Sequence, residues 1–178
     1  MTFYKYILSI SFALTVGTTS AQQLSSERLD TTISIFWNPN LKVRVQILNP
    51  DEPETKNKNT ILTLYSLNQG YQLILYRDSI FAYTLQFKMM DLDGDGIQDF
   101  LVYNTNNGAE NRSYHLYLVD QKLGHLIKVK GFEKVFNPHY DQKKCIILGF
   151  ESFERKLILN YYRVNKKGTL SITTSPYP

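Results

Sequence analysis

The stretch FKMMDLDGDGIQDFLVY, residues 87–103, places an acidic loop between two runs of strand character. The run after the loop, DFLVY at 99–103, is short and rich in β-forming residues, which predicts a strand. Before the loop, apolar and polar residues alternate over 80–90, and this period of two predicts a half-buried strand. The stretch therefore predicts a strand–loop–strand unit of an antiparallel sheet.

The same period of two continues on both sides of this unit. In LKVRVQI, residues 41–47, every second residue is aliphatic, so one face of a strand would be apolar. Asn-Gln-Gly at 68–70 and Lys-Lys-Gly at 166–168 have the composition of tight hairpin turns. Strands are expected at 41–47, 60–66, 71–77, 80–90, 99–103, 113–119, 145–150, 157–164 and 169–174.

These strands predict a single all-β domain over residues 22–178, built from roughly nine to eleven antiparallel strands. Helix signals are weak, and residues 25–30 or 131–135 suffice for one turn at most. Two arrangements fit the pattern: a propeller-like meander of four-stranded blades, or a curved, barrel-like sheet. The aspartate motif occurs once, which argues against a full multi-blade propeller.

Residues 1–21 have the layout of a cleavable secretory signal peptide. Lys5 precedes an apolar run, and Thr19 and Ala21 stand at the positions that a signal peptidase requires. The apolar run is about a dozen residues long, whereas a membrane-spanning helix needs roughly 20. We therefore expect a periplasmic or secreted protein with no transmembrane segment after signal cleavage.

Composition excludes some classes of partner. The formal net charge of +4 is mild, and no Lys/Arg block is interleaved with stacking aromatics, so no nucleic-acid partner is expected. The chain has one cysteine, which excludes a disulfide within it. Cys145 lies in an apolar run, where we expect a buried and inert thiol.

The aspartate loop has the spacing of a calcium site. Asp91, Asp93 and Asp95 would occupy loop positions 1, 3 and 5, and Gly96 would permit the tight turn after them. The backbone carbonyl of Ile97 and the carboxylate of Asp99 would complete the set. Oxygen-only donors in this number suit Ca²⁺ better than Zn²⁺ or Mg²⁺. The predicted cofactor is one Ca²⁺ ion.

The loop is not that of an EF-hand. An EF-hand needs a bidentate glutamate at position 12, where this chain has Val102, and it needs flanking helices where this chain has strands. A calcium ion enclosed by protein oxygens is a structural strut rather than a catalyst.

No enzyme signature is recognisable. The nucleophile-elbow, zinc-protease and phosphate-loop motifs are missing. His115, His125 and His139 are far apart in the sequence, with His115 in a predicted strand and the other two in turn-like segments. Nothing in the sequence places Glu151 and Glu154 in a cleft as an acid–base pair. The chain is therefore predicted to be non-enzymatic.

The aspartate loop resembles the FG-GAP and VCBS-type calcium loops of extracellular β-propellers. A longer stretch, Met90 to Gly149, resembles a family of exported bacterial proteins, with Val135 where that family usually has leucine. Some members are similar in fold to inhibitors of invertebrate-type lysozyme and act as immunity proteins, so the resemblance implies a small propeller-like β-structure with calcium. The matching residues are Gly108, Asn111, Tyr114, Tyr117, Asp120, Val135, Asn137, Pro138, Tyr140 and Asp141.

If the inhibitor resemblance holds, the segment 104–114 is the candidate contact. Such inhibitors insert a polar loop into a cleft that holds two carboxylates, so Arg112 would pair with a carboxylate and Tyr114 would stack on the rim. In the alternative, this segment is an ordinary connection and Tyr114 packs in the sheet. The candidate partner-binding residues are Asn107, Glu110, Asn111, Arg112 and Tyr114.

The expected function is thus an exported, calcium-stabilised, non-enzymatic protein that binds a protein partner, extending to inhibition of a lysozyme-like peptidoglycan hydrolase. The alternative is a carbohydrate- or cell-envelope-binding β-module, in which the tyrosines of the mature chain would supply stacking platforms for a glycan.

Overall fold

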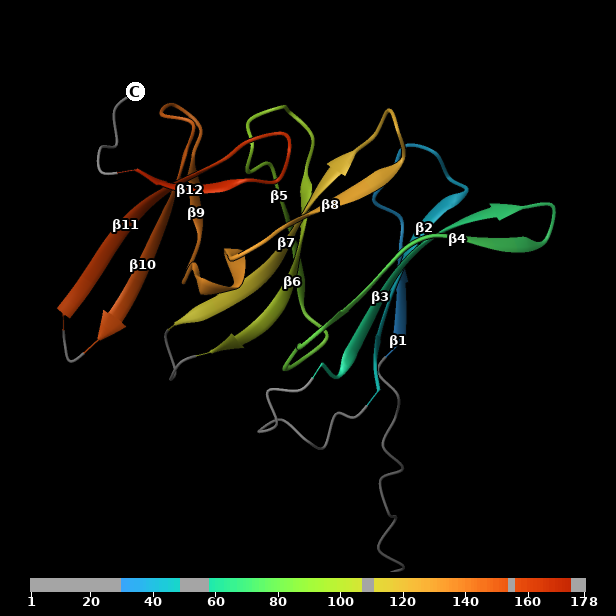
Figure 1. The fold of residues 1–178 in the computed structure, drawn as a ribbon, viewed down its shortest axis with the longest axis horizontal. Helices are drawn as coiled ribbons and strands as arrows, with labels where there is room; N and C mark the ends of the chain where they lie inside the picture. Colours follow the sequence, from blue (N-terminus) through green and yellow to red (C-terminus); the bar gives the residue numbers. More distant parts are fainter. Residues whose placement is uncertain (1–29, 49–57, 107–110, 154–155, 174–178) are drawn as a thin grey trace, which may run out of the picture.

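The computed structural model describes residues 30–48, 58–106, 111–153 and 156–173. These residues form three four-stranded antiparallel sheets, which confirms the predicted all-β fold (Figure 1). No helix among them is long and apolar enough to cross a membrane. The predicted signal peptide, residues 1–21, lies outside the described residues. The elements are β1 (Asp30–Ile33), β2 (Leu41–Ile47), β3 (Thr60–Asn68), β4 (Tyr71–Ile80), β5 (Phe87–Met90), β6 (Asp99–Asn106), β7 (Arg112–Asp120), β8 (His125–Val129), the 3₁₀ turn η1 (Phe132–Lys134), β9 (His139–Asp141), β10 (Ile146–Phe153), β11 (Lys156–Val164) and β12 (Leu170–Thr173).

Each sheet is a meander in which every strand pairs with its neighbour along the chain. The first sheet has the order β1-β2-β3-β4, the second β5-β6-β7-β8 and the third β12-β11-β10-β9. The described strands do not close a barrel, so the arrangement follows the first of the two predicted alternatives, four-stranded blades. In Figure 1 the second sheet lies between the other two.

The described residues hold twelve strands, more than the predicted nine to eleven, because three short strands were missed. β1, β8 and β9 are four, five and three residues long, too short for a period of two to stand out. β8 and β9 begin at His125 and His139, so the prediction of turns at these two histidines was wrong. The single helical turn expected at 131–135 is confirmed by η1.

The predicted strand at 80–90 is broken, because the chain crosses there from the first sheet to the second. β4 ends at Ile80 and β5 begins at Phe87. Between them, the buried Ala82 is fixed by Asn59, whose Oδ1 accepts a hydrogen bond from the Ala82 N–H at 2.9 Å. The Tyr83 N–H then donates to the carbonyl of Asn104 in β6. In a continuous strand, neighbouring backbone groups would bond to the strands of one sheet. Here the Ala82 N–H bonds to the side chain of Asn59, just before β3, and the Tyr83 N–H bonds to β6 of the second sheet.

Two hydrophobic cores lie on opposite faces of the second sheet. Because successive side chains of a strand point to opposite faces, Phe100 of β6 packs into the first core and Leu101 into the second. The first core joins Phe100 to Val45 and Leu62 of the first sheet, and the second joins Leu101 to Ile147 of the third. This burial on both sides explains why residues 100–103 form a continuous hydrophobic run instead of alternating with polar residues.

Positive φ angles mark the hairpin turns. Gln69 and Gly70 between β3 and β4 have φ of 47° and 86°, the signature of a type I′ turn, and the Asn-Gln-Gly prediction is confirmed. Residues 166–168 likewise join β11 to β12, with Gly168 at φ 73°. Cys145 has φ 51° and is exposed, so the prediction of a buried thiol was wrong. The cysteine belongs to the turn before β10 and not to the strand.

Candidate metal centre

The acidic loop 91–98 connects β5 to β6, and the pairing of Met90 with Asp99 closes its base. Asp91 shapes the loop, because its two carboxylate oxygens accept hydrogen bonds from the N–H groups of Gly94, at 2.8 Å, and Gly96, at 3.0 Å. Both glycines have positive φ, 77° and 85°. A Cβ atom at Gly94 would also lie 2.6 Å from the hydroxyl of Tyr140 in β9, so the third sheet reaches the loop there.

Two further aspartates close turns inside the loop. Asp93 Oδ1 accepts a hydrogen bond from the Asp95 N–H at 3.1 Å, and Asp95 Oδ1 accepts one from the Ile97 N–H at 2.8 Å. Aspartate favours turns of this kind, in which a backbone N–H bonds to the nearby carboxylate instead of to a neighbouring strand. The half-buried side chain of Ile97 packs against the first core, which anchors the end of the loop.

Asp99 is a buried carboxylate, only 2% exposed, at the start of β6. Its Oδ2 accepts a hydrogen bond from the Leu92 N–H at 2.9 Å, and its Oδ1 accepts one from the Val119 N–H at 3.2 Å. The side chain thus ties the loop to β7. Each carboxylate oxygen keeps a lone pair for a further ligand.

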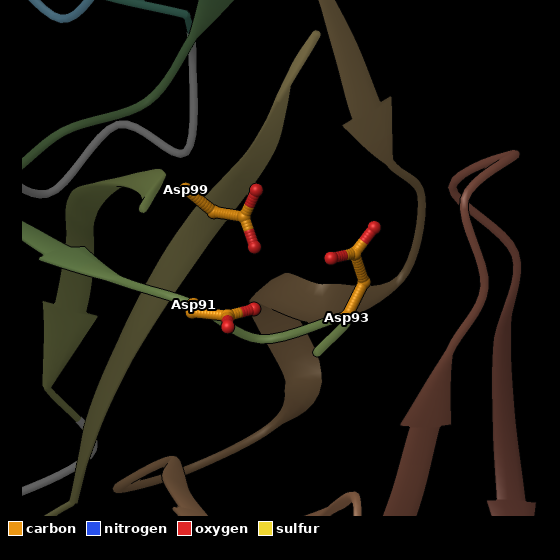
Figure 2. A group of neighbouring side chains, drawn as sticks. All are labelled: Asp91, Asp93 and Asp99. Atoms are coloured by element: carbon orange, nitrogen blue, oxygen red, sulfur yellow. The ribbon is translucent and has the colours of Figure 1, made fainter. Parts of the chain in front are cut away.

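Three carboxylates converge across the loop. Asp91, Asp93 and Asp99 each have a carboxylate oxygen, and these atoms all lie within 4.8 Å of one another. Figure 2 shows the three side chains pointing into a common space, Asp99 from its strand and the other two from the loop. Asp95 stays outside this group: it is exposed, and its carboxylate is turned to Ile97. Of the four aspartates predicted as ligands, the structure groups three. The Ile97 carbonyl stays a predicted ligand.

The electrostatics of the cluster favour a bound cation. Burial raises the pKa of Asp99 to about 7. The hydrogen bond from the Leu92 N–H opposes this rise, and the negative charge of Asp93 adds to it. Burial and the charge of Asp95 also raise the pKa of Asp93. Carboxylates held this close repel one another when ionised, and a cation among them reverses that cost. The donors are all oxygen, which fits Ca²⁺.

The candidate partner residues at 104–114 fall into three groups. Asn107 and Glu110 lie outside the described residues. Arg112, at the start of β7, is exposed. Asn111 and Tyr114 are each 3% exposed, which fits the alternative in which Tyr114 packs in the sheet. Asn111 exchanges two hydrogen bonds with the backbone of Ser152 in β10, while Tyr114 packs edge-on to Tyr103 in the second core.

Arg112 borders a basic groove that the sequence did not reveal. The groove has a volume of about 520 Å³ and is lined by Lys88, Arg112, Tyr114, Asn137, Pro138, His139 and Phe150. Lys88 Nζ lies 5.0 Å from the centre of the Tyr114 ring, so the buried tyrosine forms the floor beneath the ammonium. Lys88 and His139 come from β5 and β9, strands of different sheets. No local sequence pattern brings them together.

The histidines do not meet in one site. His115 is a buried structural residue of β7, and its Nε2 lies 2.9 Å from the Phe81 carbonyl, with which it forms a hydrogen bond. His125 begins β8 in the second sheet and His139 begins β9 in the third. Among the residues that the structure describes, one group of His, Cys, Asp or Glu side chains is close enough to hold a metal ion, and it consists of Asp91, Asp93 and Asp99.

Replacing His115 with glutamine is expected to flatten part of the acid dependence of stability. Burial, and then the nearby ammonium of Lys128, lower the pKa of His115 below its ordinary 6.5. The unfolded chain then binds the proton more tightly, so folded-state stability falls as the pH drops from 6.5 through the lowered pKa. Glutamine does not titrate and can still donate to the Phe81 carbonyl.

Denaturant unfolding at about pH 7.5 and about pH 5 measures this difference. Other groups that titrate in this range, such as Asp99, are present in both proteins and cancel in the comparison. The free energy of unfolding of wild type should fall more between the two than that of His115→Gln. The exposed His139, replaced in the same way, is the control and should keep the wild-type difference. If the unfolding free energy of His115→Gln falls between the two pH values as much as that of wild type, His115 is not the source of this acid dependence.

A scan against protein-family models, a search of the curated proteins and a search of the solved structures each found no match to this chain.

Proposed function

We propose that this chain is an exported, calcium-stabilised, non-enzymatic protein that binds and inhibits a lysozyme-like peptidoglycan hydrolase. The observation that carries the proposal is the basic groove at the start of β7, where Arg112, Lys88 and His139 surround a concave surface. Hydrolases of this class act through a cleft that holds two carboxylates, and a cationic groove complements such a cleft in charge.

Calcium would hold the scaffold behind the groove. Asp91, Asp93 and Asp99 would supply carboxylate ligands, and the loop spacing adds Asp95 and the Ile97 carbonyl as candidates. Bound there, the ion would neutralise the aspartates and fix the loop. Because the loop leads directly into β6, and β6 pairs with β7, the start of β7 would be ordered before a partner arrives. Such preorganisation lowers the entropic cost of binding.

Arg112 is the residue best placed to contact a carboxylate. It is exposed at the first position of β7, while its backbone N–H is fixed by Asn137 Oδ1 at 3.0 Å. A guanidinium can donate two parallel hydrogen bonds to one carboxylate, which makes it more specific than a lysine. Asn137 in turn bonds the Phe150 carbonyl, so the groove wall around Arg112 is tied to the third sheet.

Inhibition assays test the proposal. The mature protein is titrated into invertebrate-type lysozyme and a panel of lysozyme-like peptidoglycan hydrolases, and at least one should be inhibited. The double variant Lys88→Glu/Arg112→Glu should weaken that inhibition at least about tenfold, because reversing groove charges opposes a carboxylate cleft. Both side chains lie at the surface, so the fold should be retained.

The control is Lys167→Glu, a charge reversal at an exposed position in the turn between β11 and β12. It changes the net charge in the same direction without altering the groove. Equal weakening by the control and the groove variant would mean that only overall charge matters. Failure of wild type to inhibit any member of the panel would count against the proposed partner.

A further inference from the structure

A second concave surface lies at the end of the acidic loop, beside the exposed Trp37. The cavity has a volume of about 410 Å³ and is bounded by the segment after β1, by β5 and by the end of the acidic loop. Its lining residues carry no ionisable side chain; they are Ile33, Ser34, Ile35, Trp37, Met89, Gly96, Ile97, Gln98 and Gln121.

The backbone at Trp37 is held by hydrogen bonds although the residue is exposed. Trp37 is 78% exposed, and it is the one tryptophan of the chain. Its backbone N–H donates to Gln121 Oε1 at 2.8 Å, and Gln121 Nε2 donates to the Ile35 carbonyl at the same distance. Gln121 thus clamps the backbone on both sides of Phe36, a core residue 6% exposed.

The backbone after Trp37 is fixed as well. Asn38 accepts hydrogen bonds from the Asn40 N–H, through its side chain, and from the Leu41 N–H, through its carbonyl. Trp37 therefore projects from a short segment that is anchored at both ends. A rigid aromatic with two rotatable bonds loses little entropy on binding, which is why such residues serve as anchors in recognition surfaces.

The polar groups of the cavity are neutral. Gln98 is exposed and offers both a donor and an acceptor, and the hydroxyl of Ser34 accepts a hydrogen bond from Lys42 Nζ at 2.7 Å. Lys42 itself is not among the lining residues, and its ammonium meets the edge of the cavity through the neutral hydroxyl of Ser34. A charged ligand would find no opposite charge in the lining, and a wholly apolar ligand would leave the amide and hydroxyl groups without partners.

We propose that this cavity, with Trp37 as its platform, binds an uncharged saccharide chain. A sugar ring combines an apolar C–H face, which would stack on the indole, with hydroxyl groups, which would bond to Gln98 and Ser34. The cavity volume falls within the range of small-ligand sites, roughly 300–1,000 Å³. This site is separate from the basic groove, and the inference does not depend on the proposed protein partner.

The single tryptophan makes the test direct. The mature wild-type protein, in buffer containing Ca²⁺, is titrated with chitohexaose, cellohexaose and maltohexaose while the intrinsic tryptophan fluorescence is followed. At least one of these neutral oligosaccharides should give a saturable change, because Trp37 is the only indole that can report it. Hexagalacturonate, which carries a carboxylate on every ring, should bind at least tenfold more weakly.

Variants compared by calorimetric titration locate the site. Trp37→Ala should weaken binding of the best saccharide at least tenfold, and Gln98→Ala should weaken it severalfold. The matched control is Tyr71→Ala, since Tyr71 is an equally exposed aromatic, 79%, at the far hairpin of the first sheet. It should bind as wild type does, and the melting temperatures of all three variants should match that of wild type.

Three outcomes would overturn the inference. These are no binding of any neutral saccharide, binding that survives Trp37→Ala, or equal binding of hexagalacturonate. A fourth result would reassign the surface: if no saccharide binds but Trp37→Ala abolishes hydrolase inhibition, Trp37 is a protein contact. The groove variant Lys88→Glu/Arg112→Glu should leave saccharide binding unchanged, so this inference and the proposed inhibition fail separately.

Discussion

In excess chelator, the Asp99→Ala variant is expected to unfold with a free energy about 2–5 kcal/mol below that of wild type. Asp99 is buried, and its two oxygens accept hydrogen bonds from the N–H groups of Leu92 and Val119. Alanine would leave both N–H groups buried without a partner, each at a cost of about 1–3 kcal/mol. This loss needs no metal, because it concerns hydrogen bonds within the chain. Part of it is offset, because alanine also removes a buried carboxylate whose ionisation is costly in the metal-free fold.

Added Ca²⁺ should reveal a second contribution of the acidic loop to the free energy of unfolding. If Ca²⁺ binds the folded chain alone, a concentration of 100 times its Kd adds about 2.7 kcal/mol to wild-type stability. Asp95→Ala is the matched control: its exposed carboxylate accepts a hydrogen bond from the Ile97 N–H at the surface of the loop, so the variant should unfold near wild type in chelator. Because the loop spacing makes Asp95 a candidate ligand beside the three grouped aspartates, the variant should gain less from calcium. Asp99→Ala should show both losses.

Denaturant unfolding of the three proteins, in chelator and in excess Ca²⁺, measures both contributions. Wild-type unfolding that does not respond to calcium would refute the metal proposal and leave the hydrogen-bond account standing. Conversely, an Asp99→Ala variant as stable as wild type in chelator would refute the hydrogen-bond account.

The second large effect is expected at Asp78, where a single carboxylate joins two sheets. Asp78 of β4 accepts hydrogen bonds from the Tyr117 hydroxyl of β7, at 2.8 Å, and from Lys128 Nζ of β8, at 2.6 Å. Tyr117 is fully buried, and the carboxylate side chain is 17% exposed. Asp78→Ala should cost about 2–4 kcal/mol, because it leaves a buried hydroxyl and an ammonium unpaired.

Asp30 supplies the control for this ion pair. It bonds Arg44 and Gln46 within the first sheet, close to the surface, and Asp30→Ala should cost less than about 1 kcal/mol. Burial opposes ionisation of Asp78, but the hydrogen bonds from Lys128 and Tyr117 outweigh it and lower the pKa below 3.8. The contribution of Asp78 is therefore present above pH 3.8 and lost as the pH falls through the lowered pKa.

Denaturant unfolding near neutral pH tests the contrast. Similar losses for Asp78→Ala and Asp30→Ala would mean that the pair between the sheets contributes no more than a surface pair. Asp78→Asn, which keeps an oxygen acceptor for Tyr117, should lose less than Asp78→Ala.

The sequence predicted those parts of the fold in which a local pattern determines the structure. The period of two at 41–47 matches β2 residue for residue, and Val102 indeed lies in a strand. The pattern failed at 80–90, where a tertiary hydrogen bond to Asn59 diverts the chain between sheets. It also failed for β9, whose three residues are strand only because β10 pairs with them.

The candidate sites divide in the same way. Spacing along one loop identified Asp91, Asp93 and Asp99, because a short loop constrains where its side chains point. It did not reveal that Asp95 turns away towards Ile97. The burial of Tyr114 depends on a core shared between two sheets, and the Trp37 cavity depends on residues 33–37 meeting residues 96–98. Contacts of such long sequence separation have no local signal.

The meander topology has a consequence for how the chain folds. Each ladder joins strands that are consecutive in the sequence, and most connections between them are short turns, such as the one at Gln69 and Gly70. Little loop-closure entropy is lost when such a hairpin forms, so contact order within each sheet is low for an all-β protein. The longer closures are those between sheets, and the middle sheet takes part in both cores. A nucleus that contains β6 and β7 would therefore offer each neighbouring sheet a surface on which to condense, and substitutions there would slow folding more than equal losses at β1 or β12.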